Sequence, residues 1–164
     1  MDVDEAIRTK RAVRRFTDQP LSEEVIRAIL DAGRRAQSSK NTQPWHFIAI
    51  CDRETLQQLA TCGTYAGHLA GAALGIALIT SESWGFDLGQ AAAYMQLAAW
   101  NHGVGSCLAS MWEPEKARGI LGVPEDLRFD IAISFGYPAE TQERPGTVTG
   151  GRRPFDEVVR WERW

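Results

Sequence analysis

Apolar residues recur at helical spacing in the first third of the chain. Val25 and Ile26 lie four and three positions before Ile29, which is the spacing of the buried face of an amphipathic helix. Ser22 stands just before this run and is a preferred N-cap residue. We therefore predict a helix that begins after Ser22 and ends near Ala36.

A second long helix is predicted in the middle of the chain. Asp87, followed three residues later by Gln90, resembles a capping box, so we expect the helix to begin there and to reach about His102. Its residues are apolar on all sides, which predicts burial on nearly every side. The other helices are expected at Val3–Thr9, from the cap Asp52 through Leu59, from Pro114 to about Leu121, and as a short helix or arm at Pro154–Trp164.

Four segments are rich in strand-forming residues and are mostly continuous apolar runs. They are Trp45–Cys51, Leu74–Thr80, Ser106–Ser110 and Arg128–Gly136. Such runs are typical of strands that are covered on both faces, and they alternate with the predicted helices. The pattern predicts an α+β or α/β sandwich with one layer of sheet between helices. The length of 164 residues is that of one domain, which spans residues 1–164.

Charge is distributed unevenly along the chain. The net charge is −3, which excludes a globally basic nucleic-acid-binding protein. All 18 Lys and Arg residues lie in residues 1–53 and 116–164. Either the middle of the chain is simply buried, or the two cationic ends converge on an anion.

The three cysteines, Cys51, Cys62 and Cys107, give no sign of a disulfide framework or a zinc site, because they are widely spaced and form no CxxC pair. The apolar run Leu69–Ile79 is shorter than the ~20 residues of a membrane-spanning helix. The acidic N-terminus does not resemble a signal peptide. We expect a cytoplasmic protein with no membrane or nucleic-acid partner and no bound metal.

Most local motifs in the sequence are weak. Gly103-Val104-Gly105 lacks the third glycine of a dinucleotide-binding turn and follows a predicted helix rather than a strand. The histidines have no metal-binding spacing, and no Gly-x-Ser-x-Gly elbow points to a serine nucleophile. We therefore expect a tight turn at Gly103 rather than a nucleotide site.

Two polar segments carry more information. The basic run Lys10–Arg15 is followed by Phe16, and arginine forks suit phosphate oxygens, although a run of charges is usually a solvated face. The polar residues 38–43 lie between a predicted helix and a predicted strand. They form either an ordinary polar loop or a set of donors and acceptors for a flat heteroaromatic ligand.

In their order along the chain, four motifs resemble those of the nitroreductase family of FMN-dependent oxidoreductases. They are Lys10-Arg11-Ala12-Val13-Arg14-Arg15-Phe16, Ser38-Ser39-x-Asn41-x-Gln43-Pro44-Trp45, Gly136-Tyr137-Pro138 and Arg152-Arg153-Pro154. The second motif is the most specific, and the resemblance covers residues 7–164. It implies a central mixed sheet covered by helices and an intertwined homodimer with FMN at the interface.

The resemblance implies that cationic side chains hold the cofactor. Lys10, Arg11 and Arg152 would meet the phosphate or the ribityl chain, and Arg14 would approach the pyrimidine edge of the ring. Cations at these places would offset the cost of burying a phosphate with nearly two negative charges. A cation at the ring edge would also stabilise the reduced flavin and raise its reduction potential.

The polar loop is expected to serve the flavin of the other subunit. The resemblance places Ser38, Ser39 and Asn41 there, with Gln43 in the same signature. It also places a backbone N–H of the segment Ser110-Met111 opposite the hydride-accepting nitrogen of the ring, and it leaves the contacts of residues 61–71 open.

Two positions depart from the family pattern. Ala12 stands where many members have serine, which removes a hydrogen bond. Gly150 stands where some members carry a second basic residue, so Arg153 is expected to take that role. The full set of expected cofactor positions is Lys10, Arg11, Ala12, Arg14, Ser38, Ser39, Asn41, Gln43, Ser110, Met111, Arg152 and Arg153.

The expected activity is that of an NAD(P)H-dependent FMN oxidoreductase. Hydride from NADH or NADPH would pass through the flavin to a nitroaromatic, a quinone or a similar conjugated acceptor in a ping-pong cycle, with no catalytic protein residue. Reductive dehalogenases, dehydrogenases and a flavin-fragmenting enzyme share the same fold. These activities stay open, as do a non-catalytic flavin-binding module and a generic domain without a cofactor.

Two tryptophans, Trp161 and Trp164, stand at the end of the chain. Tryptophan is enriched at protein interfaces, and exposed tryptophans are unfavourable for solubility. We expect this terminal segment to pack on the partner subunit, with packing on its own chain as the alternative.

Overall fold

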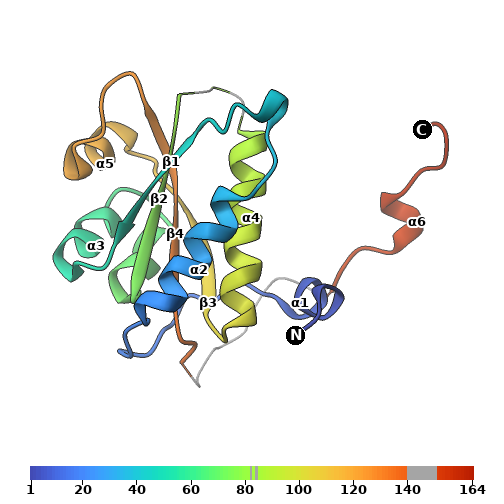
Figure 1. Cartoon of the computed structure of the whole chain (residues 1–164), viewed down its shortest axis with the longest axis horizontal. Coiled ribbons are helices and arrows are strands. Elements are labelled where there is room, and N and C mark those ends of the chain that lie inside the picture. Colours follow the sequence, from blue (N-terminus) through green and yellow to red (C-terminus); the bar gives the residue numbers. More distant parts are fainter. Residues whose placement is uncertain (82, 84, 140–150) are drawn as a thin grey trace.

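A computed structural model of the chain describes residues 1–81, 83, 85–139 and 151–164. At its centre is a four-stranded sheet with the order β1-β2-β4-β3 (Figure 1). The strands are β1 (Trp45–Ile50), β2 (Leu74–Thr80), β3 (Gly105–Ser110) and β4 (Arg128–Gly136). All four strands predicted from the sequence are confirmed, with ends that differ by at most a residue. Gly150 lies outside the described residues.

The strand directions differ from the mixed sheet that we expected. The pairs β1–β2, β2–β4 and β3–β4 are all antiparallel. β2 and β3, which α4 (Phe86–Asn101) connects, therefore run in the same direction, but β4 lies between them and opposes both. Among the described residues, an isolated bridge between Ala12 and Ser106 is parallel.

Helices cover both faces of the sheet, as the apolar strands predicted. α2 (Glu23–Arg34) and α4 pack on one face, whereas α3 (Arg53–Ala60), the 3-10 helix η2 (Ala66–Gly71) and α5 (Pro114–Leu121) pack on the other (Figure 1). The side chains of β2 alternate between these two cores: Ile76 and Leu78 join the first, and Ala77 and Ile79 join the second. The α+β architecture is therefore confirmed.

The long helix α4 differs from its prediction in two ways. It begins at Phe86, after Gly85, so Asp87 lies inside the first turn instead of capping the helix. The Asp87 carboxylate is buried; one oxygen accepts a hydrogen bond from the Ser39 N–H at 2.9 Å, and the other accepts one from Gln90 Nε2 on its own helix at 3.4 Å. Nor is the helix buried all round, because Phe86 is 63% and Tyr94 is 42% exposed.

The remaining elements lie near the ends of the chain and in one loop. They are α1 (Val3–Thr9), the 3-10 helix η1 (Ser39–Asn41) and α6 (Phe155–Val158). The caps Ser22 and Asp52 are confirmed, because their side chains accept hydrogen bonds from Val25 N–H and Thr55 N–H. The 3-10 helices had no counterpart in the predicted elements.

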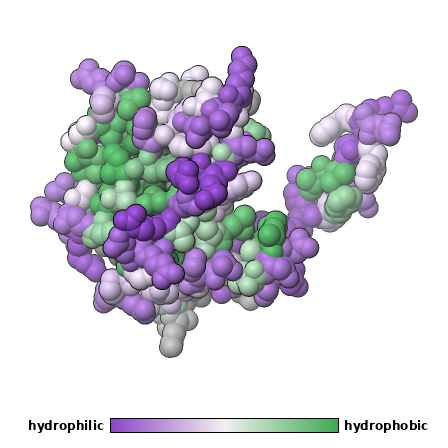
Figure 2. Space-filling model, in the orientation of Figure 1, coloured by the Kyte–Doolittle hydropathy of each residue, from purple (hydrophilic) through white to green (hydrophobic). Residues whose placement is uncertain are grey.

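The C-terminal segment projects away from the body of the protein (Figure 1). Figure 2 shows apolar atoms on this arm, and its exposed large apolar residues are Phe155, Val158, Trp161 and Trp164. In the described part of the chain, no helix has both the length and the apolar character needed to cross a membrane.

Candidate functional site

The basic N-terminal segment is fixed along the edge of β3. The Val13 N–H donates to the Ser106 carbonyl at 2.9 Å. A Cβ at Gly105 would lie 2.6 Å from the Cβ of Val13, so only glycine permits this approach of the two backbones. Gly136 has the same relation to Phe16, whose ring would lie 2.8 Å from an added Cβ. These glycines place the basic residues beside one edge of the sheet.

Cations from the two ends of the chain converge at this edge. Burial lowers the pKa of the Lys10 ammonium and the positive charge of Arg152 lowers it further, while Cys107 acts in the opposite direction. Burial raises the pKa of the Cys107 thiol, and the positive charges of Arg14 and Lys10 oppose that rise. Lys10 is therefore within electrostatic range of Arg152, and Cys107 is within electrostatic range of Arg14 and Lys10. A bound anion would stabilise such a cluster.

Arg11 takes a different direction from its neighbour Lys10. Its guanidinium carbon lies 5.8 Å from the centre of the Trp100 ring on α4, within the range of a cation–π contact. The Trp100 Nε1–H donates to Thr9 Oγ1 at 2.9 Å. This contact holds the end of α1 on α4, so in this structure Arg11 contributes to the support of the basic segment.

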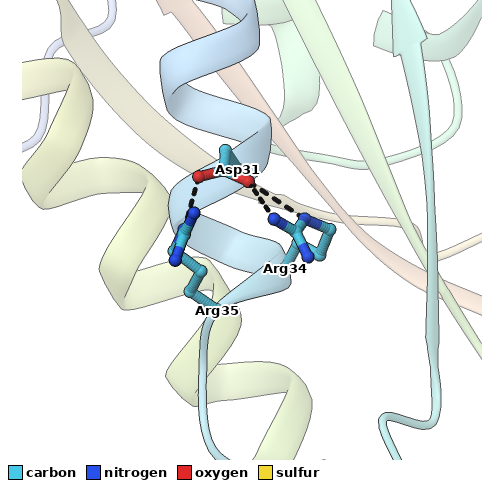
Figure 3. Close-up of polar contacts among 3 residues, drawn as sticks. All are labelled: Asp31, Arg34 and Arg35. Carbon is cyan, nitrogen blue, oxygen red and sulfur yellow. Dashed lines mark hydrogen bonds and ion pairs between the residues drawn. The ribbon is translucent and has the colours of Figure 1, made fainter.

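Arginines elsewhere on the surface are engaged in local ion pairs. At the end of α2, Arg34 Nε lies 3.0 Å from one carboxylate oxygen of Asp31 and Arg35 Nε lies 2.5 Å from the other (Figure 3). These pairs are exposed, so each contributes little to the free energy of unfolding. Arg34 and Arg35 are therefore paired with a carboxylate at the end of their own helix, whereas Lys10 at β3 is bonded to a neutral amide.

The free edge of β3 beyond Ser106 presents backbone groups. The Met111 N–H donates to the Asp130 carbonyl at 2.9 Å, so it faces β4. Because backbone groups alternate along an antiparallel strand, the N–H groups of Leu108 and Ser110 face outward. Of the expected pair Ser110-Met111, Ser110 is thus the residue whose N–H is directed to the edge. Gly63 approaches the same place, where an added Cβ would lie 2.1 Å from the Ser110 carbonyl oxygen.

A histidine that the sequence analysis gave no role lies beside this edge. His68 Nδ1 is 2.7 Å from Ser134 Oγ, and the Ser134 hydroxyl donates to the Cys107 carbonyl. Nδ1 therefore carries the proton in this arrangement. Nε2 is buried and forms no hydrogen bond with the described residues. Burial lowers the pKa of His68, and so does the positive charge of Arg14, while the Leu108 backbone acts in the opposite direction.

The polar loop of residues 38–43 has an unusual backbone. Lys40, Asn41 and Gln43 have φ angles of 51°, 56° and 49°, in the left-handed region that non-glycine residues rarely adopt. The Ser38 hydroxyl accepts the Gln43 N–H at 2.9 Å, and Asp87 accepts the Ser39 N–H. Strain of this kind persists only where surrounding contacts enforce it, so the loop is held in one conformation.

The loop and the cation cluster lie toward opposite ends of α4. Asp87, near the start of the helix, contacts the loop, whereas Gln96, nine residues later, contacts Lys10. At 1.5 Å per residue these contacts are separated by about 14 Å along the helix axis. Within one chain the structure therefore does not bring Ser39 and Asn41 together with Lys10 and Arg152.

A groove of about 460 Å³ runs between α4 and the sheet. Its apolar walls include Leu88, Ala92 and Leu108, and Gln96 also lines it. Clefts of this size and character are typical of small-molecule sites. No group of three or more His, Cys, Asp or Glu side chains suited to a metal ion occurs within residues 1–81, 83, 85–139 and 151–164.

The sequence profile of the nitroreductase family matches residues 7–63 and 82–137 of this chain. The chain belongs to the nitroreductase family. It is 32% identical over its whole length to an NADH dehydrogenase/NAD(P)H nitroreductase of Methanothermobacter thermautotrophicus, of which it covers 88%. A protein of the same name from Archaeoglobus fulgidus is 32% identical over 84% of the chain and 86% of its own length.

The fold of this nitroreductase-family chain also matches solved structures. The structure of an FMN-dependent nitroreductase from Clostridium difficile R20291 superposes with a TM-score of 0.85. The match covers 97% of this chain and 98% of the other, with 28% identity. The nitroreductase fold expected from the four motifs is thereby confirmed, while the individual cofactor contacts stay predictions.

Proposed function

We propose that this chain is an FMN-dependent oxidoreductase that accepts hydride from NADH or NADPH and passes it to a nitroaromatic, a quinone or a similar conjugated acceptor. The observation that carries the proposal is the basic segment at the edge of β3, where Val13 is bonded to Ser106 and Lys10 to Gln96, with Arg152 within electrostatic range of Lys10. The names of its relatives in the family support the same class of activity.

The residues at the β3 edge fit FMN. Lys10 and Arg152 would provide two positive charges for a phosphate, and Arg14, which acts electrostatically on Cys107, would lie closer to the ring. The outward N–H of Ser110 would donate to the ring, and Gly63 has no side chain to displace the Ser110 backbone beside it. FMN, when bound, supplies the hydride-transfer chemistry.

The contribution of the protein is to bind, orient and exclude water. Arg14 would hold positive charge at one edge of the ring, and the apolar walls of the groove would exclude water from its neighbourhood. Because donor and acceptor would use the same groove in turn, we propose ping-pong kinetics. Parallel lines in double-reciprocal plots would support this mechanism, and intersecting lines would contradict it.

We propose that the active species is a homodimer. Three features support it: the exposed apolar residues of α4, the exposed apolar residues of the C-terminal arm, and the separation of the loop from the cation cluster along α4. In a dimer, the loop of one subunit would complete the site of the other. The free cysteines Cys51, Cys62 and Cys107 are compatible with the reducing cytoplasm as the site of action.

A visible absorption spectrum of the purified protein tests the proposal. We expect the absorption bands of bound oxidised flavin, or their appearance when FMN is added, and their bleaching by NADH or NADPH without oxygen. Reoxidation by a quinone or a nitroaromatic compound would complete the cycle. Failure to bind FMN would reject the proposal. Bound FMN that neither nicotinamide reduces would favour the alternative flavin chemistries or a non-catalytic module.

A further inference from the structure

Gln96 is a buried amide on an otherwise mostly apolar helix. Its side chain is only 6% exposed and is directed from α4 toward β3. A buried amide without hydrogen bonds would destabilise the fold, so its contacts identify what it does.

The Gln96 amide links three elements of the site. Its Oε1 accepts a hydrogen bond from Lys10 Nζ at 3.1 Å, and its Nε2 donates to Ser106 Oγ at 3.2 Å. An ammonium group can only donate, which fixes the orientation of the amide. Ser106 is itself buried on β3, and its carbonyl accepts the Val13 N–H. Gln96 therefore joins α4 to the strand that aligns the basic segment.

The partner that Gln96 offers to Lys10 is neutral. A carboxylate at the same place would hold the ammonium and also neutralise it. The amide holds the ammonium and leaves its positive charge in place, beside the positive charge of Arg152. The arrangement suits an additional anionic ligand with a high charge density, such as a phosphomonoester.

We propose that Gln96 is a positioning residue that holds Lys10 for the phosphate of FMN and so makes the site selective for FMN over riboflavin. The proposal rests on the proposed function. Riboflavin has the same ring and the same ribityl chain but no phosphate. A residue that acts through Lys10 on the phosphate must therefore affect the two ligands differently.

The test compares the dissociation constants of FMN and riboflavin for the full-length protein, measured by quenching of flavin fluorescence. In Gln96→Leu we expect FMN to bind about tenfold more weakly, with riboflavin binding unchanged within about twofold. Gln57→Leu, on the exposed side of α3, is the matched control and should preserve both constants.

A second variant separates positioning from packing. Gln96→Glu keeps an oxygen for Lys10 and an acceptor for the Ser106 hydroxyl, so a merely structural role would be preserved. Its negative charge would compete with the phosphate, and we expect FMN to bind at least about tenfold more weakly while riboflavin is unaffected. This variant also gives a result if Gln96→Leu does not fold.

Two outcomes would overturn this inference and leave the proposed function standing. The first is an FMN-to-riboflavin ratio in both variants equal to that of the wild type. The second is an equal loss for both ligands, which would mean that Gln96 contacts the ring or only packs. If the wild type does not bind FMN, the proposed function fails first and this inference fails with it. Selective loss of FMN, absent when Lys10→Met is already present, would establish the positioning role.

Discussion

The two ends of α4 each bury one polar side chain, and the two side chains are used in opposite ways. Near the start, Asp87 is a charged acceptor for a neutral group, the Ser39 N–H. Nine residues later, Gln96 is a neutral acceptor for a charged group, the Lys10 ammonium. The first turn of a helix stabilises negative charge, so Asp87 can be buried there. Gln96 leaves the positive charge of Lys10 in place.

The two ends of the helix therefore contribute different features to the candidate site. The Asp87 end fixes the shape of a loop in which Lys40, Asn41 and Gln43 have positive φ angles. The Gln96 end fixes the position of a charge without neutralising it. In the proposed dimer, shape from one subunit and charge from the other would form one cofactor site.

The largest expected effect is the loss of the charge at the Gln96 end. In Lys10→Met combined with Arg152→Ala we expect FMN to bind about a hundredfold more weakly, because two charge-assisted contacts to phosphate are lost. Fluorescence titration with FMN measures this. Arg34→Ala combined with Arg35→Ala removes the same formal charge from the surface pairs of Figure 3 and is the control. An equal loss in the control would show a general charge effect instead of a site.

The next effect concerns the shape at the other end. In Asp87→Ala, the Ser39 N–H loses its buried acceptor, and we expect the free energy of unfolding to fall by about 2 kcal/mol. Urea unfolding measures this change. Asp31→Ala removes an exposed carboxylate from α2 and should leave the free energy of unfolding nearly unchanged. Equal effects of the two substitutions would mean that Asp87 does not hold the loop.

Mixed dimers of the two variants test whether the loop of one subunit and the cations of the other form one FMN site. Asp87→Ala and the Lys10→Met, Arg152→Ala variant should each bind FMN poorly alone. After co-refolding, half of the dimers would combine both chains, and one of their two sites would be intact, so about a quarter of the sites should recover normal affinity. No recovery among mixed dimers would show that each site is built from one chain.

The sheet was the most predictable part of the molecule, for a physical reason. β2 is buried along its whole length, and the sequence of a strand that is buried on both faces is a continuous apolar run. The caps Ser22 and Asp52 were equally readable, because each side chain bonds its own helix. The local sequence pattern was enough to predict an element wherever the interacting residues are close together in the sequence.

Features that depend on distant partners were not predictable in the same way. Asp87 has the position of a cap in the sequence, yet its carboxylate accepts from Ser39, far away in the chain. Nothing local to residues 39–41 indicates the 3-10 helix that this contact helps to hold. The available signal for Gln96 was an amide among the apolar residues of the helix, which does not reveal Lys10 as its partner.

The candidate site shows the same division. The charge distribution left open whether the middle of the chain is simply buried or the two ends converge, and in the structure Arg152 lies within electrostatic range of Lys10. The sequence could not tell that the Met111 N–H would be directed to Asp130, which leaves the outward direction to Ser110. That distinction depends on the pairing register of β3 with β4. Register is a property of two strands, so it is not contained in either segment alone.

The smallest expected effect is on the pH dependence of the free energy of unfolding, through His68 near Arg14. Burial lowers the pKa of His68, as does the positive charge of Arg14, with the Leu108 backbone opposing them. The unfolded chain therefore takes up a proton more readily than the folded one. The contribution of neutral His68 to stability is fully present above its ordinary pKa of 6.5 and is lost progressively as the pH falls toward the folded pKa. Urea unfolding of the cofactor-free protein from about pH 8 to about pH 5 measures this loss. His68→Gln should reduce the decline, because it cannot be protonated, and Arg14→Met should reduce it by removing the repelling charge. If the free energy of unfolding of both variants falls with pH as steeply as that of the wild type, His68 does not sense the charge at this end of α4.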